Sequence, residues 1–255
     1  YCIQTWSCDN SVYEYNEILD AHAGIYVKNL YQSGVTIRYN YINLTDYTGG
    51  GSINGVFGCD YGDTGVQHVS CHHNVIVAQN PIRIHDLGNG LAGPSQFYNN
   101  TLVAIGSDFG VCGAQVYGDG NAIDFYNNIV YHSGSSANEE GDLVMTTTNT
   151  GILNYNRYPA TPKFGRCASG SYYPTTTTAS LATWAAAMST TDGDEAGSSV
   201  GDPTFAATGS KAAYYQLGGG SACINGGKSN GLSGGSTVDQ GAWGNSAPAT
   251  IGCDF

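Results

Sequence analysis

The side chains best suited to chemistry lie in one repeated frame between residues 28 and 86. They are Lys28, Asp60, Arg83, His85 and Asp86. Asp60 and Asp86, on neighbouring strands, would lie close enough for one of them to have a raised pKa, and their spacing suits a retaining glycosidase pair. Alternatively, Lys28 or His85 could remove a proton beside a uronate carboxylate while Arg83 neutralises the developing charge. If the protein is an enzyme, this set predicts a polysaccharide lyase or a glycosidase.

Aromatic residues in the same frame offer platforms for sugar rings. Three of them are expected to point outward beside the charged residues: Tyr26, Phe57 and Tyr117. The competing interpretation is structural, because Asp and Asn after a strand are ordinary turn residues. Asp60 and Asp86 would then form a ladder of turn side chains with Asn29. A calcium ion held by Asp60, Asp63 and Asp86 is the one cofactor that the pattern allows.

Three histidines come close together in the sequence, at His68, His72 and His73. Because His72 and His73 flank a predicted turn, their side chains are expected to point in opposite directions. A protein metal site of the zinc type needs at least three convergent ligands. The sequence therefore predicts no metal site at these histidines.

A repeat organises the first 160 residues and must position these side chains. A tyrosine- and asparagine-containing block recurs, and its aligned asparagines are Asn16, Asn40, Asn74, Asn100, Asn128 and Asn156. Before each of these asparagines apolar residues alternate, which is typical of a strand. After it the inward position shifts, so the chain is expected to bend at the Asn, which tolerates left-handed backbone. Such units bury their apolar faces only when they are stacked.

A further strand precedes each block, so the sequence predicts an all-β, right-handed parallel β-helix with three strands per coil. We expect coils over residues 1–160, a Thr-rich loop with one short helix over 161–200, and closing coils of the same domain over 201–255. The helix follows Ser180, a good N-cap residue, and its spacing packs Leu181, Trp184 and Met188.

Composition limits the functional classes. The chain has 8 basic and 20 acidic residues, a net charge of −12, and no apolar run long enough to span a membrane. Nucleic acids and anionic lipids are poor partners for such a chain, because phosphate binding needs clustered Lys and Arg. We therefore expect no nucleic-acid partner and no membrane insertion, and we expect other copies of the chain, polysaccharides or glycans as partners.

Cysteines and glycosylation motifs indicate a secreted or cell-surface protein. Scattered cysteines in this composition favour disulfides, with Cys2–Cys8 the easiest local pair. Cys71 is the exception, since its inward repeat position suits a buried thiol. The other candidates for disulfides are Cys59, Cys112, Cys167, Cys223 and Cys253. Two N-glycosylation acceptors occur, at Asn43 and Asn99, although such short motifs often arise by chance.

The repeated blocks and the tail resemble one known superfamily. The carrying segments are the Y-N-x-I/L blocks and residues 201–205, 215–217, 221–227, 239–241 and 251–252. The sequence is similar to secreted right-handed β-helix proteins of the pectin-lyase-like superfamily, and its tail resembles the closing segment of choice-of-anchor proteins. The resemblance implies the fold and an outward sheet face where related enzymes hold substrate. It implies no single activity, because lyases, glycosidases, adhesins and fibres share this fold.

The first coil is the other informative region. Only eight residues precede the first repeat, too few for the helix that usually covers this end, so the first coil should expose strand edges and apolar side chains. Either a second copy covers them, which builds a filament when the contact is heterologous, or an upstream segment does. An extracellular structural protein that stacks end to end is thus our first hypothesis. A polysaccharide enzyme is the second, and a carbohydrate-binding adhesin is the third.

Overall fold

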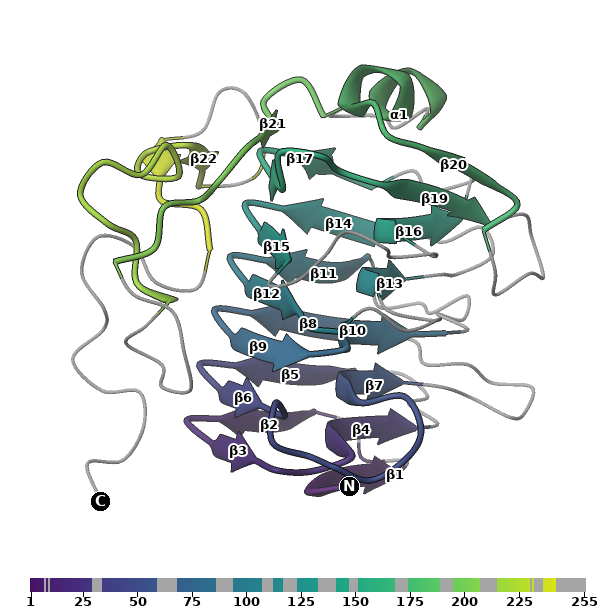
Figure 1. Ribbon diagram of the computed structural model, residues 1–255. Helices are drawn as coiled ribbons and strands as arrows, with labels where there is room; N and C mark the ends of the chain where they lie inside the picture. Colours follow the sequence, from purple (N-terminus) through teal and green to yellow (C-terminus); the bar gives the residue numbers. More distant parts are fainter. Residues whose placement is uncertain are drawn as a thin grey trace.

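The protein is a stack of β-strand coils. The computed structural model describes residues 1–6, 8, 10–28, 34–58, 68–85, 94–106, 112–116, 123–132, 141–146, 151–167, 174–188, 195–206, 215–229, 231 and 236–241. Three parallel sheets run the length of the stack, and each coil contributes one strand to each sheet (Figure 1). This confirms the predicted all-β parallel β-helix with three strands per coil. Within the described ranges, no helix has the length and apolar character needed to cross a membrane.

The three sheets are named A, B and C. Sheet A contains β1 (Ile3–Trp6), β4 (Ala23–Lys28), β7 (Asn54–Gly58), β10 (Asn80–Ile84), β13 (Cys112–Val116), β16 (Gly141–Thr146), β19 (Phe164–Cys167) and β20 (Thr176–Thr178), of which β20 is antiparallel to β19. Sheet B contains β2 (Ser11–Glu14), β5 (Val35–Arg38), β8 (Val69–His72), β11 (Ser95–Tyr98), β14 (Ile123–Tyr126) and β17 (Leu153–Asn154). Sheet C contains β3 (Glu17–Leu19), β6 (Tyr41–Asn43), β9 (Val75–Ala78), β12 (Thr101–Ala104), β15 (Ile129–His132), β18 (Arg157–Tyr158) and β21 (Ser199–Val200). A small antiparallel pair, β22 (Gly227–Lys228) and β23 (Thr237–Val238), lies outside these sheets.

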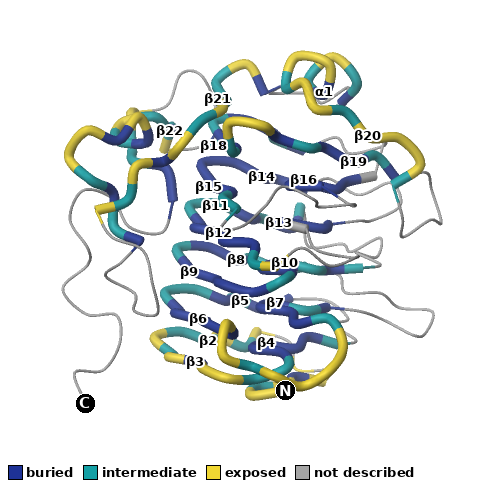
Figure 2. The backbone as a smooth tube through the Cα atoms, viewed as in Figure 1, coloured by how far each residue is buried: buried dark blue, intermediate teal, exposed yellow. Residues whose placement is uncertain are grey.

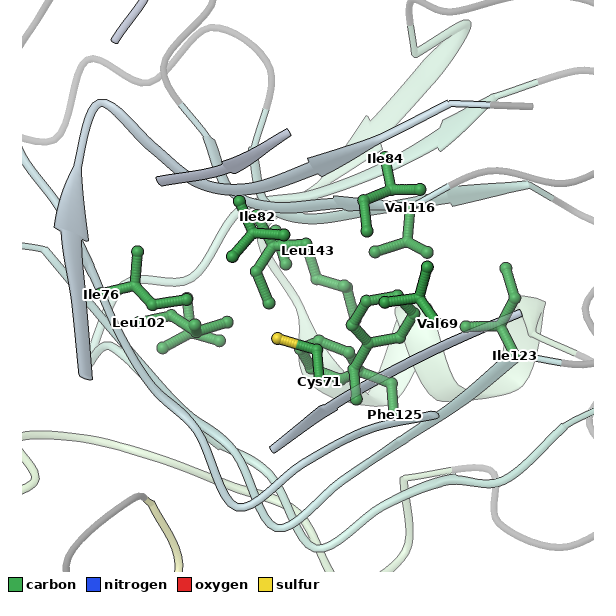
Figure 3. Close-up of a cluster of buried hydrophobic side chains, with 14 of the residues drawn as sticks. Val69, Cys71, Ile76, Ile82, Ile84, Leu102, Val116, Ile123, Phe125 and Leu143 are labelled. Atoms are coloured by element: carbon green, nitrogen blue, oxygen red, sulfur yellow. The ribbon is translucent and has the colours of Figure 1, made fainter. Parts of the chain in front are cut away.

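The interior of the stack is one apolar column. Residues at the same repeat position pair in register, so that Ile37 aligns with Cys71 and Phe97 aligns with Phe125. The inward residues predicted from the alternation are buried, and several of them converge in Figure 3, among them Val69, Cys71, Ile76, Leu102, Ile82 and Phe125. Because each coil covers the next, short strands obtain a core that none of them could form alone.

A ladder of asparagine side chains joins the coils at the corner between sheets B and C. The Oδ1 of Asn74 accepts the backbone N–H of Asn40 at 3.0 Å and its side-chain N–H at 2.9 Å. The same pair of bonds links Asn16 to Asn40, Asn74 to Asn100, Asn100 to Asn128, and Asn128 to Asn156. From Asn40 onward these asparagines are fully buried, so the ladder satisfies polar groups that burial would otherwise leave unpaired.

The position of the bend differs by one residue from the prediction. The left-handed residue is the one before each ladder asparagine, with φ between 52° and 58° at Tyr15, Tyr39, His73, Asn99, Asn127 and Tyr155. The ladder asparagines are held in place by coil-to-coil hydrogen bonds, and the bend is formed by their predecessors. Tyrosine and histidine adopt this backbone because the bonds on either side of the bend fix it.

The last coil is closed by the predicted helix. Helix α1 (Leu181–Ala187) begins at Ser180, whose Oγ accepts the backbone N–H of Thr183 at 3.2 Å. Trp184 and Met188 are buried against the core, and Trp184 stacks on Phe164 at a ring distance of 5.1 Å. In Figure 1 this helix lies across the end of the stack, above β19 and β17.

The described part of residues 201–241 departs from the predicted closing coils. These residues, here called the tail, lie on the outer face of sheet C and along the B–C corner (Figure 1). Tyr215 packs with Val75 and Val103 of sheet C, and the backbone N–H of Gly241 donates to the carbonyl of Asn127 at 2.8 Å. Because sheet C carries apolar side chains on both faces, its outer face needs a cover, and the tail provides it.

Candidate functional site

The outward face of sheet A carries the charged and aromatic residues that the sequence assigned to a site. Register places Tyr26 beside Phe57, Phe57 beside Arg83, and Arg83 beside Gln115. The predicted column is therefore present, with successive side chains about 4.8 Å apart. Asp60, Asp63, Asp86, Asn29 and Tyr117 lie outside the described residues, so the carboxylate pair and the calcium site remain predictions.

The aromatic rings of this column stack on each other. Tyr26 lies between the rings of Tyr1 and Phe57, at centroid distances of 4.7 Å and 5.1 Å, and both pairs are nearly parallel. Tyr26 is also buried. Both of its ring faces are therefore covered by neighbouring rings, and they are not available to a sugar as the sequence interpretation assumed.

Arg83, His85 and Gln115 form the polar centre of the face. Arg83 Nε lies 3.1 Å from His85 Nε2, which accepts the hydrogen bond, and Gln115 Oε1 lies 3.4 Å from the same nitrogen. Burial, and then the positive charge of Arg83, lower the pKa of His85 to about 4. At neutral pH the imidazole is therefore uncharged and its Nε2 lone pair is engaged, which makes His85 a weak base for removing a proton.

Lys28 belongs to a lower part of the same face. Its Nζ lies 4.4 Å from the centre of the Trp6 ring, the residue with which it is paired in register. Two coils separate Lys28 from His85, or about 9.6 Å of stack. The structure therefore brings together Arg83 and His85 from the predicted set, and it places Lys28 apart from them.

The cysteine predictions require corrections. Cys2 and Cys8 are exposed free thiols, so the local disulfide is not formed. Strand β1 holds its ends about 13 Å apart, whereas a disulfide needs Cα atoms within about 7 Å. Cys71 is buried and free, as predicted, and Cys223 is likewise buried and free. Cys167 is buried against Val144; Cys59, Cys253 and the side chain of Cys112 lie outside the described part.

The two glycosylation motifs occupy constrained positions. Asn43 is buried, and its Nδ2 donates to the Tyr41 hydroxyl at 3.0 Å, so the predicted modification of Asn43 does not fit the folded chain. Asn99 is half-buried at the B–C corner. Its Nδ2 donates to the carbonyl of Asp239 at 3.4 Å and its Oδ1 accepts from Asn127 at 3.3 Å. A glycan on Asn99 would have to displace the tail from this corner.

The two adjacent histidines of the B–C corner touch, contrary to the prediction that they point apart. The Nδ1 atoms of His72 and His73 lie 2.8 Å apart. The left-handed backbone of His73 turns its ring back toward that of its neighbour. Burial lowers the pKa of each imidazole to about 4, with the charge of Arg38 acting in the same direction. In the described residues, no group of three or more His, Cys, Asp or Glu side chains is arranged to hold a metal ion.

Exposed apolar side chains gather at the ends of the stack. The large hydrophobic residues that are between 41% and 59% exposed are Tyr1, Trp6, Val12, Tyr15, Leu19 and Val200. The first five lie on the opening coil, here called the first-coil face, where Figure 2 shows a band of exposed backbone. Val200 is on β21, at the other end of sheet C. Sequence reasoning expected the open first coil but did not identify Trp6, Leu19 or Val200, whose outward parity on edge strands was the available signal.

The two ends also differ in charge. Residues 1–27 contain four acidic residues and no Lys or Arg, and Glu17 and Asp20 among them are exposed. Residues 153–167 contain Arg157, Lys163 and Arg166 and no acidic residue. The surface formed by α1, β20, β21 and these basic residues is here called the last-coil face. The stack therefore has an acidic, apolar end and a more basic end.

Comparison with known proteins adds no closer relative. No protein-family model matches the chain, and no curated protein matches it either. The structure shows the parallel β-helix that the sequence resemblance implied, and the resemblance therefore stands at the level of the fold.

Proposed function

We propose that the protein is an extracellular structural β-helix that assembles end to end, with the first-coil face of one copy against the last-coil face of the next. The observation that carries this proposal is the placement of the exposed large apolar side chains, which are all on the outermost strands of the stack. Apolar patches of this kind on a folded protein mark interaction surfaces.

The strand edges support the same contact. Among the described strands, β1, β2 and β3 are paired on one side only, and so are β20, β17 and β21 at the other end. Unpaired N–H and C=O groups of an edge strand are a template for pairing with another chain. A contact between two different faces is heterologous, and its repetition gives a filament when the rotation does not close a ring.

The last-coil face is closed toward the core but flat toward solvent. Helix α1 buries Trp184 below it and exposes Ala182, Thr183 and Ala186 above. The exposed aromatic residues of the first-coil face can pack against these small side chains without disturbing the core. Opposite charges on the two faces add orientation, because charge complementarity favours the correct partner and disfavours like faces.

Two single-face variants test the contact. Trp6→Lys adds a positive charge to the face that meets the basic end, and Val200→Glu adds a negative charge to the face that meets the acidic end. Each variant should be monomeric in sedimentation velocity and electron microscopy, whereas the unmodified chain forms dilution-resistant polymers. A mixture of the two should form pairs, because the altered faces attract each other. Thr45→Lys and Thr45→Glu, at an exposed residue away from both ends, are the matched controls.

Other outcomes would overturn the proposal. Monodisperse monomers of the unmodified chain at all concentrations would remove end-to-end assembly. Pairing that is abolished by Trp6→Lys but unaffected by Val200→Glu would indicate contact between two first-coil faces, which closes as a dimer and builds no filament.

The sheet A face supports a polysaccharide enzyme or an adhesin less well. His85 donates its lone-pair position to Arg83, and Tyr26 has both ring faces covered. Turnover of a uronate polymer, measured as unsaturated product, would nevertheless reverse this ranking. Equal turnover by the His85→Ala variant would then place the catalytic group elsewhere.

A further inference from the structure

The contact between His72 and His73 is unusual because neighbouring residues of a strand normally point to opposite faces. Here the left-handed backbone of His73, with φ of 55°, brings both Nδ1 atoms within 2.8 Å. The corresponding positions of the next two coils hold Tyr98 with Asn99 and Tyr126 with Asn127. Within these three coils, only the one that contains β8 therefore offers two nitrogen ligands at the bend.

The separation of the two nitrogens selects a coordination geometry. With metal–nitrogen bonds of about 2.0–2.1 Å, two ligands at a right angle lie roughly 2.8–3.0 Å apart, whereas tetrahedral ligands lie roughly 3.3–3.4 Å apart. The observed 2.8 Å matches the right-angle arrangement. Square-planar and tetragonal nitrogen sites are typical of Cu²⁺ and Ni²⁺.

The surroundings hold the two rings in place but leave access from solvent. His72 is 7% exposed and stacks on Tyr98 at 4.6 Å, whereas His73 is half-buried and packs beside Tyr39 at 5.2 Å. Fixed rotamers of this kind reduce the entropy lost when a ligand binds. Arg38 lies next to His72 in register and would repel a cation. Its charge is offset by Glu14, whose carboxylate is 2.7 Å from Arg38 Nε.

We propose that His72 and His73 are the two protein ligands of a surface site for a divalent transition ion that prefers right-angle coordination, Ni²⁺ or Cu²⁺, with water in the remaining positions. The proton that the two Nδ1 atoms share moves to Nε2 of its own ring through solvent. Both imidazoles then remain neutral and bind through Nδ1, so that binding releases no net proton. The ion forms two metal–nitrogen bonds and loses two bound waters.

The chain itself supplies variants that should preserve the fold. His73→Asn reproduces the residue found at the same left-handed position in Asn99 and Asn127, and His72→Tyr reproduces Tyr98 and Tyr126. The probe is Ni²⁺ alone, titrated calorimetrically into the untagged 255-residue chain, because Cu²⁺ would oxidise the exposed thiols of Cys2 and Cys8. His85→Gln, on the other side of the stack, is the matched control for general loss of an imidazole.

The unmodified chain and His85→Gln should bind one Ni²⁺ with the same affinity. Each corner variant should raise the dissociation constant at least about tenfold, the smallest loss typical of removing even an outer-shell partner. Circular dichroism and thermal unfolding should be unchanged without metal in all variants. Equal Ni²⁺ binding by His72→Tyr or His73→Asn would overturn the proposal, and so would an unmodified chain that binds no Ni²⁺ at millimolar concentration.

Discussion

The first and last coils end the same stack of strands in opposite ways. At the last coil, α1 covers the core with Trp184, and Glu195 accepts the side-chain N–H of Asn156 at 3.4 Å, which completes the ladder. At the first coil, Asn16 is only half-buried and the edge strands expose Trp6 and Leu19. The comparison teaches that this fold can finish an end within its own chain. The end that it leaves unfinished is therefore the surface to examine for a partner.

The largest expected contrast comes from the two tryptophans. Trp184→Ala removes a fully buried ring at the finished end and should lower the free energy of unfolding by about 3–5 kcal/mol. Trp6→Ala removes a ring that is 56% exposed and should change the stability of the monomer by less than about 0.5 kcal/mol. Urea denaturation measures both. Similar losses for the two variants would mean that the first coil is as closed as the last.

The ladder provides the second contrast, between its middle and its open end. Asn100→Ala removes the acceptor of the Asn74 backbone N–H and should cost roughly 2–3 kcal/mol, because buried donors lose their partners. Asn16→Ala lies at the half-buried end and should cost less than about 1 kcal/mol. Denaturation midpoints and hydrogen exchange of the Asn74 amide test this. Equal effects would show that the ladder does not weaken toward the first coil.

The helix cap gives a smaller effect at the finished end. Ser180→Ala removes the oxygen that accepts the N–H of Thr183 and should lower stability by about 1 kcal/mol. Ser180→Asp keeps an acceptor and serves as the control, with stability close to that of the unmodified chain. Loss of the same size in both variants would show that the cap does not hold α1 on the last coil.

The smallest expected effect is a change in pH dependence. Burial raises the pKa of Glu195 above its ordinary value of 4.5, while hydrogen bonds from Ser198, Tyr158, Asn156 and Trp184 act in the opposite direction. A raised pKa means that stability is greatest below the unfolded value and declines as pH rises through the folded pKa. Glu195→Gln should remove this decline. Parallel pH–stability curves for the two proteins would contradict the assignment.

Much of the fold was readable from the sequence because a repeat makes the same statement several times. The inward parity of Ile42, Ile76 and Leu102 and the aligned asparagines set the three sheets and their register. Ser180 and the spacing of Trp184 and Met188 set the helix. These features depend on neighbouring residues and on the period alone.

Other features depended on contacts that no period encodes. The tail covers sheet C because Val75 and Val103 point outward, and strands that are apolar on both faces do not reveal what covers them. The histidine contact was missed because the left-handed residue is His73 and not Asn74, a shift of one position that reverses a side chain. The sheet A column was placed correctly, yet its use could not be predicted, because Tyr26 has its ring faces covered by Tyr1 and Phe57.

The asparagine ladder has a direction. Every side-chain amide donates toward the following coil, from Asn16 to Asn156, so the carboxamide dipoles are aligned along the axis of the stack. Aligned dipoles place partial positive charge at their donor end, as the peptide groups of a helix do. The carboxylate of Glu195 sits at this positive end. The molecule is thus an electrically polar rod, whose opposite pole emerges at the Asn16 amide oxygen, and copies joined in one orientation would align these fields along the whole fibre.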